Sequence, residues 1–246
     1  MNMYVVEWRD GRIRTHDAVE LSTPLTGARL RDAYLQAVRR FTFGLVRMRG
    51  NSLVLGPLVL FRFGKPTVTR TSVDWPIEGG LLVGTAGGHW RIGSSEGRVE
   101  ASLSGYRPSL PRPVYLFSHL QVHLLFTRVL LLGLRGRDPL PGSVVPSPDR
   151  FRAATVDIAM CATLTRLTGR RSWGRLLAIA TVYHVACWST TGQTLGGMVM
   201  RQRVVSVDGD PLVPGQALLR FVLLPVSWVV WRPVHDEVAG TTVVEK

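Results

Sequence analysis

The chain has 246 residues, of which 46% are hydrophobic, and a formal net charge of +13. This length leaves room for one large domain or two small ones. The apolar content is high for a soluble protein but too low for a chain that lies in a membrane throughout. The composition therefore argues against an ordinary soluble protein and against a chain that is membrane-embedded throughout. It favours a chain whose two halves differ in character.

The positive charge comes almost entirely from arginine, since lysine occurs only at Lys65 and Lys246. Such a charge fits attachment and orientation at an anionic cytoplasmic membrane surface. Nucleic-acid binding is the other interpretation. However, the arginines are spread along the chain and no recognised nucleic-acid motif is present, so we expect no nucleic-acid partner.

Neither the first residues nor the cysteines indicate secretion. Residues 1–12 contain no charged segment followed by a long apolar one, so we expect no cleavable signal peptide and a cytoplasmic N-terminal half. Cys161 and Cys187 both lie in apolar runs, where we expect no disulfide framework.

The first half is predicted to be an α+β domain over residues 1–136. A short strand is predicted at 4–8. An amphipathic helix is predicted at 27–38, where Leu30, Tyr34 and Val38 recur at helical spacing. Short β-branched and aromatic runs separated by turn residues then predict an antiparallel meander. These runs are 41–49, 52–55, 59–63, 67–75, 81–85, 89–92 and 98–106.

Segment 113–133 is apolar and long enough for a helix, but it is interrupted by His119, Gln121, His123 and Arg128. It packs across the sheet, lies at a membrane interface or spans the membrane, and we favour the first two placements. His119 and His123 have the spacing of a helical metal pair. No third ligand is evident, so we expect no metal site.

The order strand, helix, long meander, long helix is that of a helix-grip, START-like domain. In such folds a bent sheet wraps the last helix around an apolar cavity. The alternative is an unrelated small α+β domain with flanking helices.

A Pro-rich linker is predicted at 137–148, followed by an all-α membrane helical module at 149–246. The module contains three apolar segments, at 151–167, 173–191 and 217–231. A helix needs roughly 20 residues to cross the hydrocarbon core, and only the second segment approaches this length. A soluble helical bundle is the competing interpretation.

Polar residues recur at the ends of these segments. Arg150 and Asp157 lie in the first segment or just before it, and Gly192-Gln193-Thr194-Leu195-Gly196 follows the second. Arg203 lies in a short predicted strand, Arg220 opens the third segment, and His235-Asp236 and Ala239-Gly240-Thr241 end the chain. In this order and spacing, about residues 147–246 resemble the RDD family of membrane proteins.

The resemblance implies a multi-helix integral membrane module, and ion or proton exchange is proposed for some members of the family. Its family-motif polar residues correspond here to Arg150, Asp157, Gln193, Thr194, Arg203, Arg220 and Asp236. The family often has Lys directly after the Gly-Gln-Thr-x-Gly stretch, whereas Gly197 stands there in this chain. The role of that cation is therefore in doubt here.

Asp157 lies two helical turns after Arg150, on a face that also carries the small residues Ala153, Ala154 and Cys161. An ionised Asp in hydrocarbon costs roughly 2.5–3.5 kcal/mol on the insertion scale. Such a carboxylate either handles a proton or ion, or pairs with an arginine such as Arg150 or Arg220. We favour the structural pairing.

No enzyme signature is present, and we expect neither enzymatic activity nor a cofactor. The leading hypothesis is a multi-pass cell-membrane protein whose module moves a small ion or scaffolds other proteins. The alternative is a membrane-anchored protein whose N-terminal domain binds a lipid or another apolar ligand. The lipid bilayer is the expected partner in both, and homo-oligomerisation stays open.

The arginines raise a conflict of topology. Both loops between the three apolar segments are arginine-rich, with Arg166 and Arg175 beside the first loop and Arg201 and Arg203 in the second. The positive-inside rule places both loops in the cytoplasm, which three full spans forbid. A re-entrant pair or an interfacial helix removes the conflict.

Overall fold

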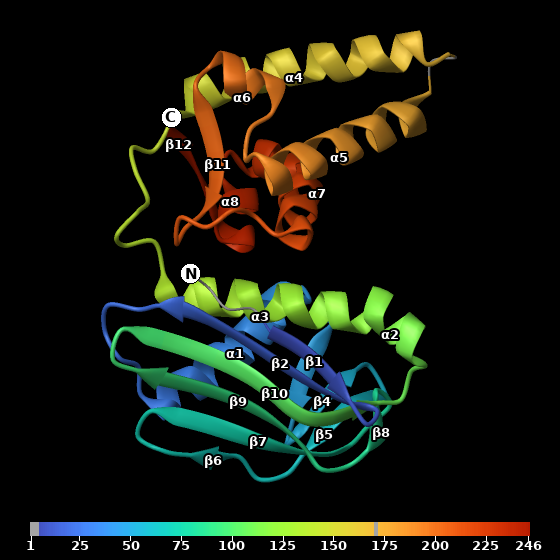
Figure 1. The fold of residues 1–246 in the computed structure, drawn as a ribbon, viewed down its shortest axis with the longest axis vertical. Helices are drawn as coiled ribbons and strands as arrows, with labels where there is room; N and C mark the ends of the chain where they lie inside the picture. Colours follow the sequence, from blue (N-terminus) through green and yellow to red (C-terminus); the bar gives the residue numbers. More distant parts are fainter. Residues whose placement is uncertain (1–4, 170–171) are drawn as a thin grey trace. The chain divides into compact units, whose positions relative to one another are not determined.

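The computed structural model describes residues 5–169 and 172–246. The chain divides into two compact units, Met1–Arg135 and Gly136–Lys246, called here the N-terminal and C-terminal units. As predicted, an antiparallel meander with helices precedes a mostly helical region (Figure 1).

The N-terminal unit is built on one antiparallel sheet with the strand order β1-β2-β10-β9-β7-β5-β4-β3, to which β6 and β8 add short pairings. Its strands are β1 (Val5–Arg9), β2 (Arg12–Glu20), β3 (Val46–Arg49), β4 (Ser52–Leu55), β5 (Leu58–Phe63), β6 (Thr67–Val68), β7 (Ser72–Gly79), β8 (Val83–Thr85), β9 (Gly88–Ser95) and β10 (Arg98–Pro108). Its helices are α1 (Gly27–Phe41), α2 (Arg112–Phe117) and α3 (His119–Arg135).

Strand β2 was not among the predicted elements, which passed from the strand at 4–8 to the helix at 27–38. Burial alternates from Arg12 to His16, but Asp17, Ala18 and Val19 are then buried in succession. Two of the buried residues, Thr15 and Asp17, are polar. Asp17 lies 3.6 Å from the Arg128 guanidinium of α3, and Thr15 hydrogen-bonds the His123 ring at 3.1 Å. A strand whose core face is partly polar has no hydrophobic period to reveal it.

Helices α1 and α3 pack on the same face of the sheet. The Tyr34 ring of α1 lies 4.7 Å from the Trp75 ring of β7 and 5.9 Å from the Phe126 ring of α3. Helix α3 crosses β2 and β10. The unit therefore has the predicted order of strand, helix, meander and helix, with the first strand extended into the β1–β2 hairpin.

Segment Arg112–Arg135 is the one stretch among the described residues that is long and apolar enough to cross a membrane. In the structure, α3 instead buries one face against the sheet, including Leu120, Thr127 and Leu131. The structure thus shows the packing that was favoured for this segment.

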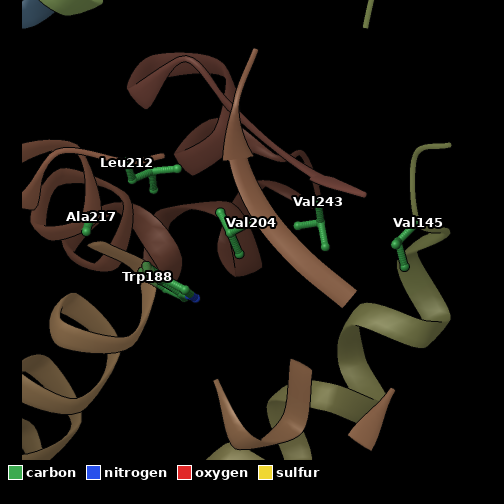
Figure 2. Packing of buried hydrophobic residues seen from close by; sticks show 6 residues of the cluster. All are labelled: Val145, Trp188, Val204, Leu212, Ala217 and Val243. Atoms are coloured by element: carbon green, nitrogen blue, oxygen red, sulfur yellow. The ribbon is translucent and has the colours of Figure 1, made fainter. Parts of the chain in front are cut away.

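The C-terminal unit contains α4 (Ser147–Leu167), α5 (Trp173–Thr190), α6 (Leu195–Val199), α7 (Pro214–Val230) and α8 (Val234–Ala239). It also contains a two-stranded antiparallel sheet of β11 (Gln202–Ser206) and β12 (Thr241–Glu245), so it is mostly helical rather than all-α. A cluster of buried hydrophobic residues joins the sheet to the helices (Figure 2). Its members are Val145, Trp188, Val204, Leu212, Ala217 and Val243.

Part of the predicted linker belongs to this second unit. Val144 bridges Val244 of β12, and the Val145 amide donates to the Val243 carbonyl at 3.0 Å. Helix α4 begins at Ser147, inside the predicted linker range of 137–148. The segment before α4 therefore runs along the small sheet.

We predict that the N-terminal unit loses stability in mild acid. Burial, together with the neighbouring His119, lowers the pKa of His123 to about 3. The unfolded chain takes up a proton near pH 6.5 while the folded unit does not, so stability present above that pH is lost as the pH falls toward 3. At pH 5 the loss is about 1–2 kcal/mol.

The measurement is urea unfolding of residues 1–136 at pH 7.5 and pH 5. The His123→Gln variant should lose about half of the acid sensitivity, because burial also lowers the pKa of His119 to about 4 and that contribution remains. His89→Gln, an exposed position, should keep the full sensitivity. An equal pH response in wild type and His123→Gln would contradict the assignment.

Candidate functional site: buried polar clusters of the C-terminal unit

The Asp236 carboxylate is the centre of the largest buried polar cluster. Arg150 of α4 donates to its Oδ2 at 2.9 Å, and Arg220 of α7 donates to its Oδ1. Thr241 of β12 donates to the same Oδ1 at 2.7 Å. Asp236 is only 2% exposed. These four residues are called the Asp236 cluster.

The Arg220 guanidinium contacts other groups besides Asp236. Its Nη1 also donates to Thr241 Oγ1 at 2.7 Å, and its guanidinium carbon lies 5.0 Å from the Trp188 ring centroid. Stacking on an indole stabilises a cation away from water. Its Nε is buried and has no hydrogen-bond partner within the described residues.

Local structure brings these groups together. Helix α8 ends at Gly240, whose left-handed φ of 64° turns the chain into β12 directly at Thr241. Arg150 also donates from Nε to the Val145 carbonyl at 2.9 Å, which ties the start of α4 to the segment before it. The Asp236 cluster therefore joins α4, α7, α8 and β12.

Asp157 belongs to a separate cluster. Its Oδ1 accepts from the Tyr183 hydroxyl at 2.8 Å and from the Gly196 amide at 2.9 Å. The same hydroxyl accepts from the Leu195 amide at 2.6 Å. Asp157 and Tyr183 thus bind the first amides of α6, and these residues are called the Asp157 cluster.

The Asp157 cluster depends on close packing of α4 and α6. A Cβ added to Gly196 would lie 2.0 Å from the Ala153 carbonyl oxygen, so any larger residue would push the helices apart. Ala153 and Cys161 are buried on the same face of α4 as Asp157. The small residues expected on this face therefore do allow another helix to approach.

The arginine partner predicted for Asp157 is wrong. Within the described residues, its hydrogen bonds come from Tyr183 and Gly196, and the two arginines proposed as partners bind Asp236 instead. The spacing of seven positions from Arg150 to Asp157 placed both residues on one helix face but did not identify their partners. Those partners lie far along the sequence, in α5 and α6.

The other predicted site residues occupy different places. Thr194 caps α6 by accepting from the Gly197 amide at 3.1 Å. Gln193 donates to the Gln202 carbonyl at 2.9 Å and accepts from Lys246 Nζ at 3.0 Å. Arg203 is exposed on β11. The predicted residues therefore form no single site.

Sequence reasoning also missed several residues of these clusters. Thr241 donates a hydrogen bond to Asp236, and Tyr183 donates one to Asp157. The Arg220 guanidinium stacks on the Trp188 ring. The spacing of Tyr183 and Trp188 along α5 resembles that of ordinary core residues. No local sequence signal distinguishes them.

The C-terminal unit is thus a helical module organised by buried charged and polar clusters. Residues 173–241 of this unit match the model of the RDD family, which establishes an RDD family domain in the C-terminal region. The match contains Arg220 and Asp236, while Arg150 and Asp157 precede it. No curated protein and no solved structure matches the chain.

We predict that Asp236→Asn destabilises the protein more than Asp157→Asn. Removing the Asp236 charge leaves the buried Arg220 and the partly buried Arg150 without a counter-charge, and breaking a buried pair costs about 3–5 kcal/mol. Asparagine at position 157 keeps an acceptor for the Gly196 amide, so its expected cost is about 1–2 kcal/mol.

The measurements are the amount of protein in the membrane fraction and its thermal aggregation midpoint in detergent. Asp236→Asn combined with Arg220→Met removes both charges and should recover part of the loss. If Asp157→Asn were the more damaging change, the Asp157 carboxylate would have a role beyond holding α6.

Proposed function

We propose that this chain is a non-enzymatic cell-membrane protein, in which the RDD domain anchors and scaffolds a cytoplasmic N-terminal unit. The proposal rests mainly on the outward faces of the C-terminal helices, which are apolar although their polar clusters are buried. Large exposed apolar side chains on α4, α5 and α7, or at their ends, include Ile158, Leu167, Trp173, Leu177, Val182, Val222, Val229 and Trp231. A soluble protein rarely leaves so many large apolar side chains exposed on neighbouring helices.

The ends of these helices support a bilayer environment. Trp173 at the start of α5 and Trp231 after α7 are 87% and 85% exposed. Arg175 and Arg232 lie two residues or fewer from them. Exposed tryptophans beside arginines are typical of the membrane–water interface.

The hydrogen bonds of the Asp236 and Asp157 carboxylates fit a scaffolding role better than they fit ion transport. Asp236 accepts from three side chains, and Asp157 Oδ1 accepts from a hydroxyl and an amide. Donors of this kind stabilise the charged form of a carboxylate and hold it in place. A carboxylate that carries a proton or ion must release such partners during each cycle.

We predict that the full chain resists extraction by sodium carbonate and by high salt but dissolves in mild detergent. Carbonate and salt remove electrostatic attachment, whereas contact between the apolar helix faces and lipid survives both. Sedimentation followed by immunoblotting measures this, with a fragment of residues 1–136 as the matched control that should stay soluble. Complete release by carbonate would overturn the proposal.

A second candidate function is ligand binding by the N-terminal unit. Three buried polar atoms there have no hydrogen-bond partner within the described residues: Trp90 Nε1, Tyr115 Oη and His119 Nδ1. The Tyr115 and His119 rings lie 5.2 Å apart, in a cluster that includes Tyr106. An aromatic wall with unused donors suits an apolar ligand that carries a polar head.

We predict that residues 1–136 bind a fluorescent fatty acid, and that Tyr115→Phe combined with His119→Leu weakens this binding about tenfold through two lost hydrogen bonds. The change keeps the size of the aromatic cluster nearly constant. Titration followed by fluorescence measures the affinity, with His89→Gln as the control. Unchanged binding in the double variant would contradict the assigned site.

A further inference from the structure

A cavity of about 300 Å³ beside α6 is lined by Gln193, Met198, Arg201 and Lys246. It is called here the cationic pocket. Two of its side chains are positively charged. Within the part of the chain that the structure describes, neither makes an ion pair with a carboxylate. The pocket therefore presents positive charge that the described side chains around it do not neutralise.

The pocket is held in place by buried groups. Gln193, which is 7% exposed, donates to the Gln202 carbonyl and accepts from Lys246 Nζ at 3.0 Å. The Lys246 amide donates to the Arg201 carbonyl at 2.9 Å, which fixes the two cationic residues beside each other. The Lys246 ammonium is thus positioned before any ligand arrives, and the backbone of Arg201 is held beside it, which lowers the entropic cost of binding.

An exposed apolar face adjoins the pocket. Leu195, Met198 and Val199 of α6 are 45%, 52% and 62% exposed. Their spacing of three and four residues places them on one side of the helix. Met198 also lines the pocket, so the positive charge and the apolar face are continuous.

We propose that the cationic pocket binds the phosphate group of an anionic glycerophospholipid, whose acyl chains lie along the exposed face of α6. Arginine binds phosphate oxygens through paired N–H groups, and lysine adds a point charge. Two cations also disfavour the positively charged headgroup of a zwitterionic lipid.

This inference rests on the proposed membrane function, because a lipid reaches the pocket only if the C-terminal unit lies in a bilayer. Arg201 and Lys246 belong neither to the Asp236 cluster nor to the Asp157 cluster. Removing the two charges should therefore leave the helices assembled and the protein in the membrane fraction.

The test is native mass spectrometry of the full chain in a neutral detergent, titrated with phosphatidylglycerol or phosphatidylcholine. Wild type should bind phosphatidylglycerol about tenfold more tightly, as expected for charge-assisted hydrogen bonds to one phosphate. Arg201→Gln combined with Lys246→Gln should abolish the preference. Arg201→Lys combined with Lys246→Arg keeps both charges and should restore most of it.

The matched control is Arg39→Gln combined with Arg40→Gln, which removes two exposed charges from α1 and should leave the preference intact. Equal affinity for both lipids, or an unchanged preference in the Arg201/Lys246 double glutamine variant, would overturn the proposal. So would displacement of the lipid by an equal concentration of inorganic phosphate, since the pocket would then recognise free phosphate.

Carbonate extraction of the same variants separates this inference from the proposed function. A double glutamine variant that stays in the membrane but has lost its lipid preference supports both. Release of wild type by carbonate overturns the membrane function, whereas an unselective wild type that stays in the membrane overturns only the lipid site.

Discussion

The pairing of Asp236 with Arg150 and Arg220 is the constraint on which the C-terminal unit depends. Arg150 and Asp236 are 86 residues apart in the sequence, yet their side chains meet at 2.9 Å. A buried guanidinium without a counter-charge is strongly unfavourable, so α4, α7 and α8 cannot separate without exposing these charges to an apolar environment. Thr241 brings β12 into the same network.

In the membrane location proposed above, such polar contacts become important because apolar packing is a weak guide there. Lipid tails are as apolar as leucine, so the hydrophobic effect does not tell the inside of the unit from its outside. The buried hydrophobic cluster in Figure 2 is small, and the outward helix faces are also apolar. The contact of Gly196 with Ala153 and the two carboxylate clusters therefore select the helix partners.

Sequence patterns were sufficient where a feature has a local period. The meander, α1 and the apolar segments follow from alternation, helical spacing and turn residues. Patterns failed at β2, because Thr15 and Asp17 face the core through partners on α3. They also failed for the partner of Asp157, because a hydroxyl from α5 and an amide from α6 depend on tertiary folding.

The β11–β12 sheet indicates on which side of a membrane the ends of α4 and α5 would lie. In the proposed membrane location, β11 and β12 would lie outside the hydrocarbon, because open strand edges are not tolerated in it. The start of α4 is tied to β12 through Val145, and the residue after α5 is tied to β11, since the Val204 amide donates to the Gly192 carbonyl. The outer ends of the α4–α5 hairpin therefore lie on the same side as the sheet.

This position of the hairpin ends restricts how the α4–α5 hairpin could be placed in a membrane. Two full spans would carry Arg166 and Arg175 across the membrane, away from Arg201 and Arg203, against the positive-inside rule. Under the proposed membrane location, a hairpin that stays at the level of one leaflet would keep all four arginines on one side, as the positive-inside rule requires. It also explains why α4 combines apolar residues with several polar ones, since an interfacial helix meets both lipid and water.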